Sequence, residues 1–92
     1  MRINYTSRKM TLREPLKEYT EKKLSKLEKF FGDESTANIV FSLEKEDMCK
    51  AEITIEHNGI IFRAQSTAPE FTLAIDSDID MLIRQIRKHK TK

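Results

Sequence analysis

The chain has 92 residues, of which 38% are hydrophobic and 35% are charged, and its formal net charge is +2. This length allows one compact domain and is too short for two, so we expect a single domain over residues 1–92. No run approaches the roughly 20 apolar residues of a membrane span, no signal peptide is visible at the start, and the lone Cys49 excludes an internal disulfide. These features predict a soluble protein of the reducing cytoplasm.

The first third of the chain predicts a strand followed by a helix. Polar and apolar residues alternate over residues 2–9, which is typical of a strand with one face on a core. Thr11 and Glu14 have the spacing of a capping box and predict that the helix starts there, with Pro15 within or just past the first turn. Gly32 is the expected stop. The residues expected on the buried stripe of this helix are Leu12, Leu16, Tyr19, Leu24, Leu27 and Phe31.

Three further strands and a second helix are expected after it. The strands cover residues 36–45, 50–57 and 60–67, and Asn58-Gly59 between the last two predicts a tight hairpin because both residues accept positive φ. The second helix runs from near Pro69 almost to the end. The strand residues expected to face the core are Ala37, Ile39, Phe41, Leu43, Ala51, Ile53, Ile55, His57, Ile60, Phe62, Ala64 and Ser66. Those of the second helix are Phe71, Ile75, Ile79, Leu82 and Ile86.

The element order is therefore β-α-β-β-β-α. Each strand has one apolar and one polar face, so the sheet is expected to be covered on one side only. Two helices on that side give an α/β (α+β) two-layer sandwich. A right-handed crossover through the first helix makes the first two strands parallel, and the other pairs antiparallel, in a four-stranded mixed sheet.

The residue types that usually carry catalysis or bind metals are scattered. His57, His89 and Cys49 fall on different elements, and His57 is interpreted as a structural residue at a strand end. Asp76, Asp78 and Asp80 lack the Gly and the distal Glu of a calcium loop, so they are interpreted as acids early in a helix that complement its dipole and balance its basic end. We expect no enzyme, no metal, no cofactor and no small-molecule substrate.

The charges are unevenly spread along the chain. Residues 1–29 hold nine basic and four acidic side chains, residues 84–92 hold five basic and none acidic, and residues 30–83 hold three basic and eleven acidic. A basic stripe on one helix is usually only a solvent-exposed face, but two stripes that could merge favour a polyanion-binding side. The candidate RNA-binding residues are Arg8, Lys9, Lys22, Lys23, Lys26, Lys29, Arg84, Arg87, Lys88, Lys90 and Lys92.

The aromatic residues of the strands bear on how RNA would be recognised. Tyr5, Phe41 and Phe62 all alternate toward the core, so the open face of the sheet is expected to lack the aromatic platform on which some RNA-binding domains stack bases. Lys and Arg side chains on helices favour contacts to the RNA backbone and its shape instead.

The two helices also carry a family resemblance. "AIDSDIDMLIRQIRKHKTK", residues 74–92, resembles the second helix of the ribosome hibernation promoting factor family, which includes ribosome-associated inhibitor A. Residues 11–31 are similar to the family's first helix. The chain departs from the pattern at Thr72 and Leu73, where the family often has Tyr followed by a small residue. It also departs at Ser77 and Asp78, where the family tends to be apolar or small. The matching residues of the second helix are Ala74, Ile75, Asp76, Ile79, Asp80, Leu82, Arg84, Gln85, Lys88 and Lys90.

The resemblance implies both a fold and a function. The family fold is the same sandwich, which is also similar in topology to the double-stranded-RNA-binding domain. Members bind the small ribosomal subunit in the mRNA and tRNA channel near the A and P sites, contact rRNA through basic residues, and inhibit translation in stress or stationary phase. The implied partner is thus the small subunit, in competition with tRNA, mRNA and initiation factors, with no membrane involved. Gln85 is expected to bind either RNA or a local partner.

Two other functions stay open, and so does the length of the protein. One alternative is a free-standing double-stranded-RNA-binding domain, and the other is a protein-interaction module that regulates a transcription factor. Long family members continue into a dimerisation domain, and the sequence leaves open whether this chain is a short member or the front part of a long one.

Overall fold

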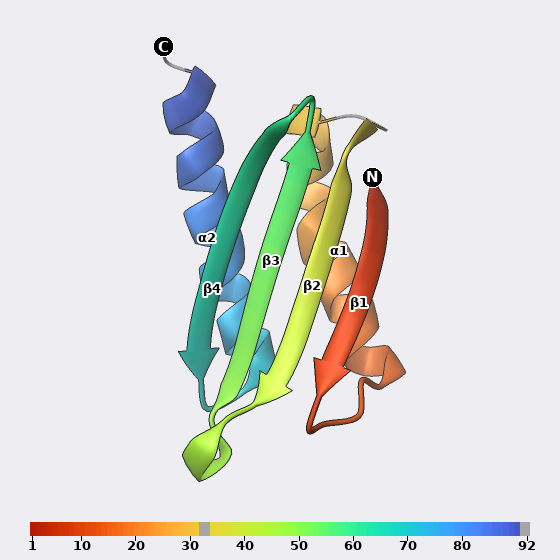
Figure 1. Ribbon diagram of the computed structural model, residues 1–92, viewed down its shortest axis with the longest axis vertical. Coiled ribbons are helices and arrows are strands. Elements are labelled where there is room, and N and C mark those ends of the chain that lie inside the picture. The colour runs from red at the N-terminus through yellow and green to blue at the C-terminus, as the bar shows by residue number, and fades with distance from the viewer. Residues whose placement is uncertain (32–33, 91–92) are drawn as a thin grey trace.

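The computed structural model describes residues 1–31 and 34–90 (Figure 1). The chain follows the predicted β-α-β-β-β-α order, with one short 3-10 turn added between the second and third strands. The expected stop at Gly32 lies outside the described residues. The elements are β1 (Arg2–Arg8), α1 (Glu14–Phe31), β2 (Thr36–Leu43), η2 (Lys45–Asp47), β3 (Cys49–His57), β4 (Ile60–Ala68) and α2 (Phe71–Lys90).

The four strands form one mixed sheet in the order β1-β2-β3-β4. β1 pairs with β2 in parallel, and the other two pairs are antiparallel, as predicted. His57 pairs with Ile60, so β3 and β4 are joined by a two-residue turn. Asn58 and Gly59 have φ of 52° and 79°, the left-handed values that such a tight hairpin requires.

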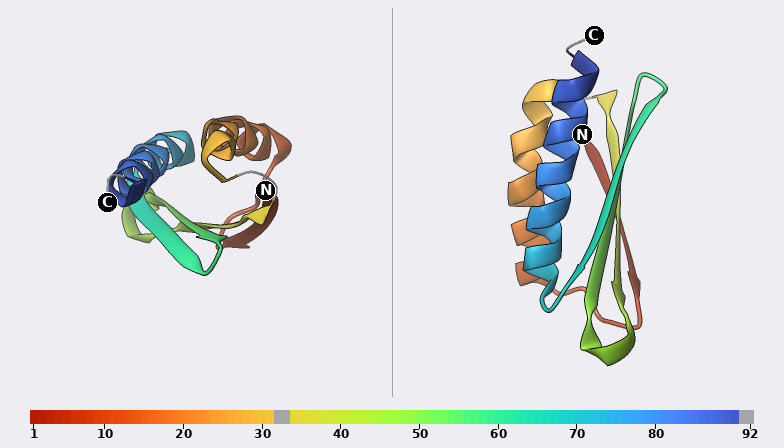
Figure 2. Two further views of the ribbon diagram at one scale, coloured as in Figure 1. Left: turned by 90° about the horizontal axis from the view of Figure 1, so that it is seen from above. Right: turned by 90° about the vertical axis from the view of Figure 1, so that its left-hand side faces the viewer.

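Both helices lie on the same face of the sheet and leave the other face open (Figure 2). β1 and β4 run in the same direction, and each is followed by a helix that turns back over the sheet. The two helices are therefore parallel to each other and pack side by side. As a result, their C-terminal ends and the β3–β4 hairpin lie at the same end of the molecule (Figure 1).

The core fills the layer between helices and sheet. It contains most of the residues that periodicity predicted, but Leu12, Leu16 and Tyr19 at the start of α1 are only half-buried, and Ile60 beside the hairpin is 37% exposed. The fully or nearly buried apolar side chains are Leu24, Leu27, Phe31, Ala37, Ile39, Phe41, Cys49, Ala51, Ile53, Ile55, Phe62, Ala64, Ala74, Ile75, Ile79, Leu82 and Ile86.

The start of α1 differs from the prediction. The helix begins at Glu14, and its first backbone hydrogen bond runs from the Lys17 N–H to the Arg13 carbonyl (3.1 Å). A helix that began just after Thr11 would place the Pro15 ring against the Thr11 carbonyl, which breaks helices. Starting at Glu14 puts Pro15 in the first turn, where its missing N–H has no role. The capping-box prediction for Thr11 was wrong for this reason.

Candidate nucleic-acid interface

The exposed lysines of α1 lie on the side of the helix that faces away from the sheet. Lys22, Lys26 and Lys29 are all exposed, whereas Leu24 and Leu27 between them are fully buried. The Lys29 ammonium lies over the Phe30 ring, 5.3 Å from its centroid. The 3.6-residue period of the helix therefore separates charge from core along its second half.

The second helix repeats this arrangement near its end. Arg84, Arg87 and Lys88 are exposed, and Leu82 and Ile86 are buried beneath them. Lys90 is the last residue of α2, and its side chain lies outside the described part of the structure, as does Lys92.

The parallel helices bring these two groups to one end of the molecule (Figure 1). We call Lys26, Lys29, Arg84, Arg87 and Lys88 the basic helix ends. Part of this clustering has a structural cause, because cations near the last turn of a helix offset the negative end of its dipole. Two parallel helices add their dipoles at the same end, so the basic helix ends both stabilise the helices and form a cationic surface.

Lys23 has a partner inside the molecule. Its Nζ lies 3.5 Å from the Asp76 Oδ1 on α2, and the Tyr19 hydroxyl donates a hydrogen bond to the same oxygen at 2.7 Å. The nearby Asp76 carboxylate raises the pKa of Lys23, and its hydrogen bond raises the pKa of Tyr19. Asp76 is therefore a link between the helices and not only an acid that balances the charge of α2.

Arg8 and Lys9 lie far from the basic helix ends. Arg8 is the last residue of β1, and β1 ends at the opposite end of the molecule from the C-termini of the helices (Figure 1). Lys9 has a φ of 61° and lines a shallow hollow with Leu43, Glu44 and Lys45. The structure thus separates these two candidates from the other basic residues that sequence grouped with them.

Gln85, a residue of the second-helix motif, holds α2 against the edge of the sheet. Its Nε2 donates to the Arg63 carbonyl (2.7 Å), and its Oε1 accepts from the Arg63 N–H (3.3 Å). Of the two roles expected for Gln85, the structure shows the local partner. β4 is an edge strand, so this amide satisfies backbone groups that would otherwise be open to another strand.

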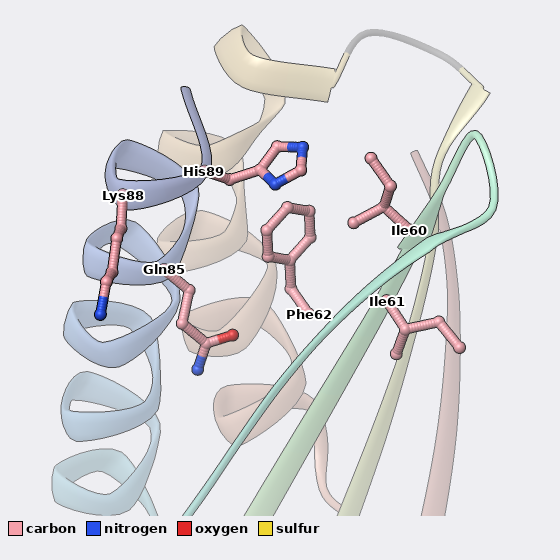
Figure 3. A pocket seen from close by; sticks show the side chains of 6 residues that line it. All are labelled: Ile60, Ile61, Phe62, Gln85, Lys88 and His89. Atoms are coloured by element: carbon pink, nitrogen blue, oxygen red, sulfur yellow. The ribbon is translucent and has the colours of Figure 1, made fainter. Parts of the chain in front are cut away.

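A surface hollow of about 310 Å³ lies beside Gln85, between β4 and the last turns of α2 (Figure 3). Most of its lining is apolar, and the His89 and Phe62 rings meet edge to face with centroids 5.8 Å apart. Lys88 is the charged residue of the lining. The hollow is lined by Ile60, Ile61, Phe62, Gln85, Lys88 and His89.

Histidine, cysteine and acidic side chains are the residue types that most often bind metals. Within residues 1–31 and 34–90, no three His, Cys, Asp or Glu side chains gather as they would around a metal ion. His57 packs edge-on against Phe31, with ring centroids 5.3 Å apart, which fits its predicted structural role. Burial raises the pKa of the Cys49 thiol, which keeps it in the less reactive neutral form. In the same ranges, neither helix is long and apolar enough to cross a membrane.

Asp78 contradicts its sequence interpretation. It was interpreted as one of three acids whose charge complements the helix dipole and balances the basic end of α2, yet its side chain is fully buried, while Asp80 is exposed. Its position explains this, because residue 78 falls on the same helical stripe as Ile75 and Leu82. The helical period contained the signal for burial, but the interpretation rested on the charge of the residue alone.

Comparisons with known proteins agree with the helix motifs. Residues 3–92 match the family described as Sigma 54 modulation protein / S30EA ribosomal protein. The ribosome hibernation promoting factor of Escherichia coli (strain K12) is 33% identical over 92 residues, which cover 100% of this chain and 96% of that protein. The ribosome hibernation promotion factor of Lactococcus lactis subsp. cremoris is 31% identical over 94 residues, and this chain spans about half (51%) of its length.

A solved structure shows the same fold. The crystal structure of the Thermus thermophilus Protein Y N-terminal domain matches with a TM-score of 0.85 and 27% identity, over 97% of this chain and 99% of that one. Fold, motifs and whole-chain similarity thus point the same way. The chain belongs to the Sigma 54 modulation protein / S30EA ribosomal protein family, the family of the ribosome hibernation factors that its helices resemble.

Proposed function

We propose that the protein binds the small ribosomal subunit and lays its basic helix ends against rRNA in the channel that mRNA and tRNA use, near the A and P sites. Occupying this channel would exclude mRNA, tRNA and initiation factors, so that ribosomes are stored inactive under stress or in stationary phase. The observation that carries the proposal is the parallel packing of α1 and α2, which gathers five exposed basic residues from two helices at one end of the molecule.

The chemistry of this surface suits an RNA backbone. Lys and Arg side chains on helices contact phosphate oxygens without reading bases. In the described strands, the aromatic side chains pack toward the helices: Tyr5 stacks on Phe41 with centroids 6.5 Å apart, and Phe62 is buried. The open face of the sheet therefore offers no stacking platform in these strands, which supports shape recognition over base recognition.

The remaining candidate residues are expected to contribute to RNA binding to different extents. Lys22 lies one turn before Lys26 on α1, and Lys90 and Lys92 follow Lys88 in the sequence. Lys23 is shared with Asp76 and would contribute less. Arg8 and Lys9 would touch RNA at the other end of a body 41 Å long. We infer one non-enzymatic ribosome-binding domain over residues 1–92, which acts in the cytoplasm by occupancy and without a cofactor.

Two other partners deserve a direct test. The family description includes modulation of sigma 54, which favours a protein partner as the second candidate. The resemblance in topology to double-stranded-RNA-binding domains keeps duplex RNA as the third. All three can be separated by capturing partners of the purified chain from lysate with and without ribonuclease.

Each outcome of this capture has one meaning. Recovery of small-subunit rRNA and proteins, lost on ribonuclease treatment, would support the proposal. Mixed duplex RNA would support a general RNA binder, and a partner that survives ribonuclease would support a protein-interaction module. Inhibition of translation in a purified system, with release of initiator tRNA from the small subunit, then tests occupancy of the channel.

A further inference from the structure

Asp78 is a buried acid at the contact between α2 and β4, and it has no charged partner of opposite sign among the described residues. Its side chain is 0% exposed. Its Oδ1 lies 2.8 Å from the Ser66 hydroxyl oxygen of β4, and its Oδ2 is buried with no hydrogen-bond partner in residues 1–31 and 34–90. A carboxylate in such a place would be an unpaired charge in the core, which is strongly unfavourable.

The hydrogen bonds around Ser66 indicate which form is present. The Ser66 oxygen also lies 2.7 Å from the carbonyl oxygen of Ala74, one turn before Asp78 on α2. A hydroxyl has a single proton and can donate only once. Both short contacts are hydrogen bonds only if Asp78 is protonated: its O–H then donates to Ser66, and Ser66 donates to the Ala74 carbonyl.

We propose that Asp78 is a proton switch of the fold, which is protonated while α2 is docked on β4 and which loosens that contact when it loses its proton. Ionisation would turn the Ser66 proton toward Asp78 and remove the hydrogen bond to Ala74. It would also leave a negative charge between two layers of apolar side chains. The contact between α2 and β4 would therefore be the first to open.

The charged and titratable groups around Asp78 favour the protonated form. From β4 it meets Ser66, which is neutral, and from β3 it feels the negative charge of Glu52. From α1, Lys23 reaches α2, but it is engaged with Asp76 at 3.5 Å. Burial is the main cause that raises the pKa of Asp78 to about 7, the charge of Glu52 adds to it, and the Ser66 hydrogen bond partly opposes it.

The direction of the pH effect follows from this shift. An unfolded chain releases the Asp78 proton near its ordinary pKa of about 4, whereas the folded chain keeps it until about pH 7. The contribution of Asp78 to stability is therefore complete below pH 4 and is lost as pH rises to about 7. The full difference corresponds to about a thousandfold in the folding equilibrium, and roughly a hundredfold of it falls above pH 5, because the first part of the loss occurs between pH 4 and pH 5.

Urea unfolding between pH 5.0 and 8.5 tests the switch, with Asp78→Asn and Asp80→Asn as a matched pair. Asn keeps the size of the acid and its amide can donate to Ser66, but it cannot titrate. The unmodified chain and Asp80→Asn should lose roughly a hundredfold in folding equilibrium across this range, and Asp78→Asn should lose less than about threefold. A pH-independent unmodified chain, or an Asp78→Asn variant that keeps the full loss, would overturn the proposal.

Two measurements on the unmodified chain keep the test independent of whether Asp78→Asn folds. The carboxyl carbon of Asp78, followed by NMR, should titrate near pH 7, and a midpoint near 4 would overturn the proposal. Amide exchange should show protection in α2 falling from pH 6 to pH 8 more than in β1 and β2, after correction for intrinsic exchange rates. An equal fall in all elements would contradict local loosening. None of these readouts involves RNA, so they stand apart from the proposed ribosome binding.

Discussion

Single side chains link the two helices, and Asp76 of α2 contacts two residues of α1. It accepts a hydrogen bond from the Tyr19 hydroxyl at 2.7 Å and lies 3.5 Å from the Lys23 ammonium. Two residues of the second-helix motif thus have structural roles. Asp76 links α2 to α1, and Gln85 links α2 to β4. Only Arg84, Lys88 and Lys90 of that motif remain as candidates for RNA contact.

A double-mutant cycle tests the link between Tyr19 and Asp76. Tyr19→Phe and Asp76→Asn each remove one partner, and their effects on the free energy of unfolding should be coupled by about 0.5–1 kcal/mol, because the contact is only partly buried. The favourable coupling should be lost once the phenol ionises at high pH, because a phenolate cannot donate a hydrogen bond and is repelled by the carboxylate. Tyr5→Phe with Asp76→Asn serves as the control. Those two residues share no hydrogen-bond partner among the described contacts, so additivity within about 0.5 kcal/mol is expected there.

Substitutions at two neighbouring residues of α1 distinguish an effect on stability from an effect on binding. Leu27 is fully buried and Lys26 is exposed. Leu27→Ala should lower the free energy of unfolding by about 2–5 kcal/mol because it opens a cavity. Lys26→Gln should change it by less than about 0.5 kcal/mol.

Affinity for the small subunit should respond in the opposite way. Lys26→Gln should weaken binding, and the slope of log affinity against log salt should become shallower by about one. Leu27→Ala should bind with the affinity of the unmodified chain once the affinity is corrected for the fraction of folded protein. The measurement is urea unfolding beside small-subunit binding at a temperature where both variants are folded. If Lys26→Gln bound with unchanged affinity, Lys26 would be a solvent-exposed residue without a role in binding.

At the scale of the elements, both helices contribute to the basic helix ends, two residues from α1 and three from α2. Replacing Arg84, Arg87, Lys88, Lys90 and Lys92 by Gln removes the basic charge of residues 84–92, while it puts good helix formers into α2 and keeps the buried stripe; we call it the α2 variant. This variant should fold, although it loses some of the favourable interaction with the helix dipole. It should lose most of its small-subunit affinity and stop competing with initiator tRNA.

A pair of double replacements with equal loss of charge provides the control. Arg8→Gln with Lys9→Gln removes two basic charges from the opposite end of the molecule, so it should weaken binding much less than Arg84→Gln with Arg87→Gln, which removes two from α2. If the α2 variant still competed with initiator tRNA at the concentrations of the unmodified chain, α2 would not be the docking surface. The lysines of α1 would then have to bind the subunit alone.

The spacing of apolar residues predicted which helices and strands form. It did not predict the burial of polar residues that lie on the buried face of a helix. Alternation in residues 50–57 and the Asn58-Gly59 turn predicted β3 and its hairpin because both signals are local. Thr20 and Asp78 lie on buried helical stripes but were not placed in the core, since their polarity suggests exposure. Each needs a partner to be buried: Thr20 donates to the Leu16 carbonyl (2.8 Å), and Asp78 meets Ser66 from β4. The second contact is tertiary, and no local pattern shows it.

At the scale of the whole molecule, the fold gathers positive charge at one end although the chain is nearly neutral overall. Its net charge is +2, yet both helices carry basic residues in their last turns and both helix ends point the same way. That direction follows from the sheet: one parallel and two antiparallel pairings make β1 and β4 run alike, so the helices after them are parallel. The predicted topology therefore already implied that the two basic stripes would meet. It also implied that Arg8 and Lys9, at the end of β1, would not join them.

Salt dependence tests this arrangement as a whole. Each phosphate contact contributes about −0.7 to −0.9 to the slope of log affinity against log salt, because binding releases condensed counterions. About six contacts from the basic helix ends and their neighbours should therefore lower small-subunit affinity by roughly two to three decades over a fourfold rise in monovalent salt, with magnesium held fixed. The α2 variant with five Gln replacements should show a shallower slope, by about one for each contact it loses. A flat response of the unmodified chain would contradict electrostatic docking even if it bound tightly. The mostly apolar hollow between β4 and α2 would then be the surface to test next.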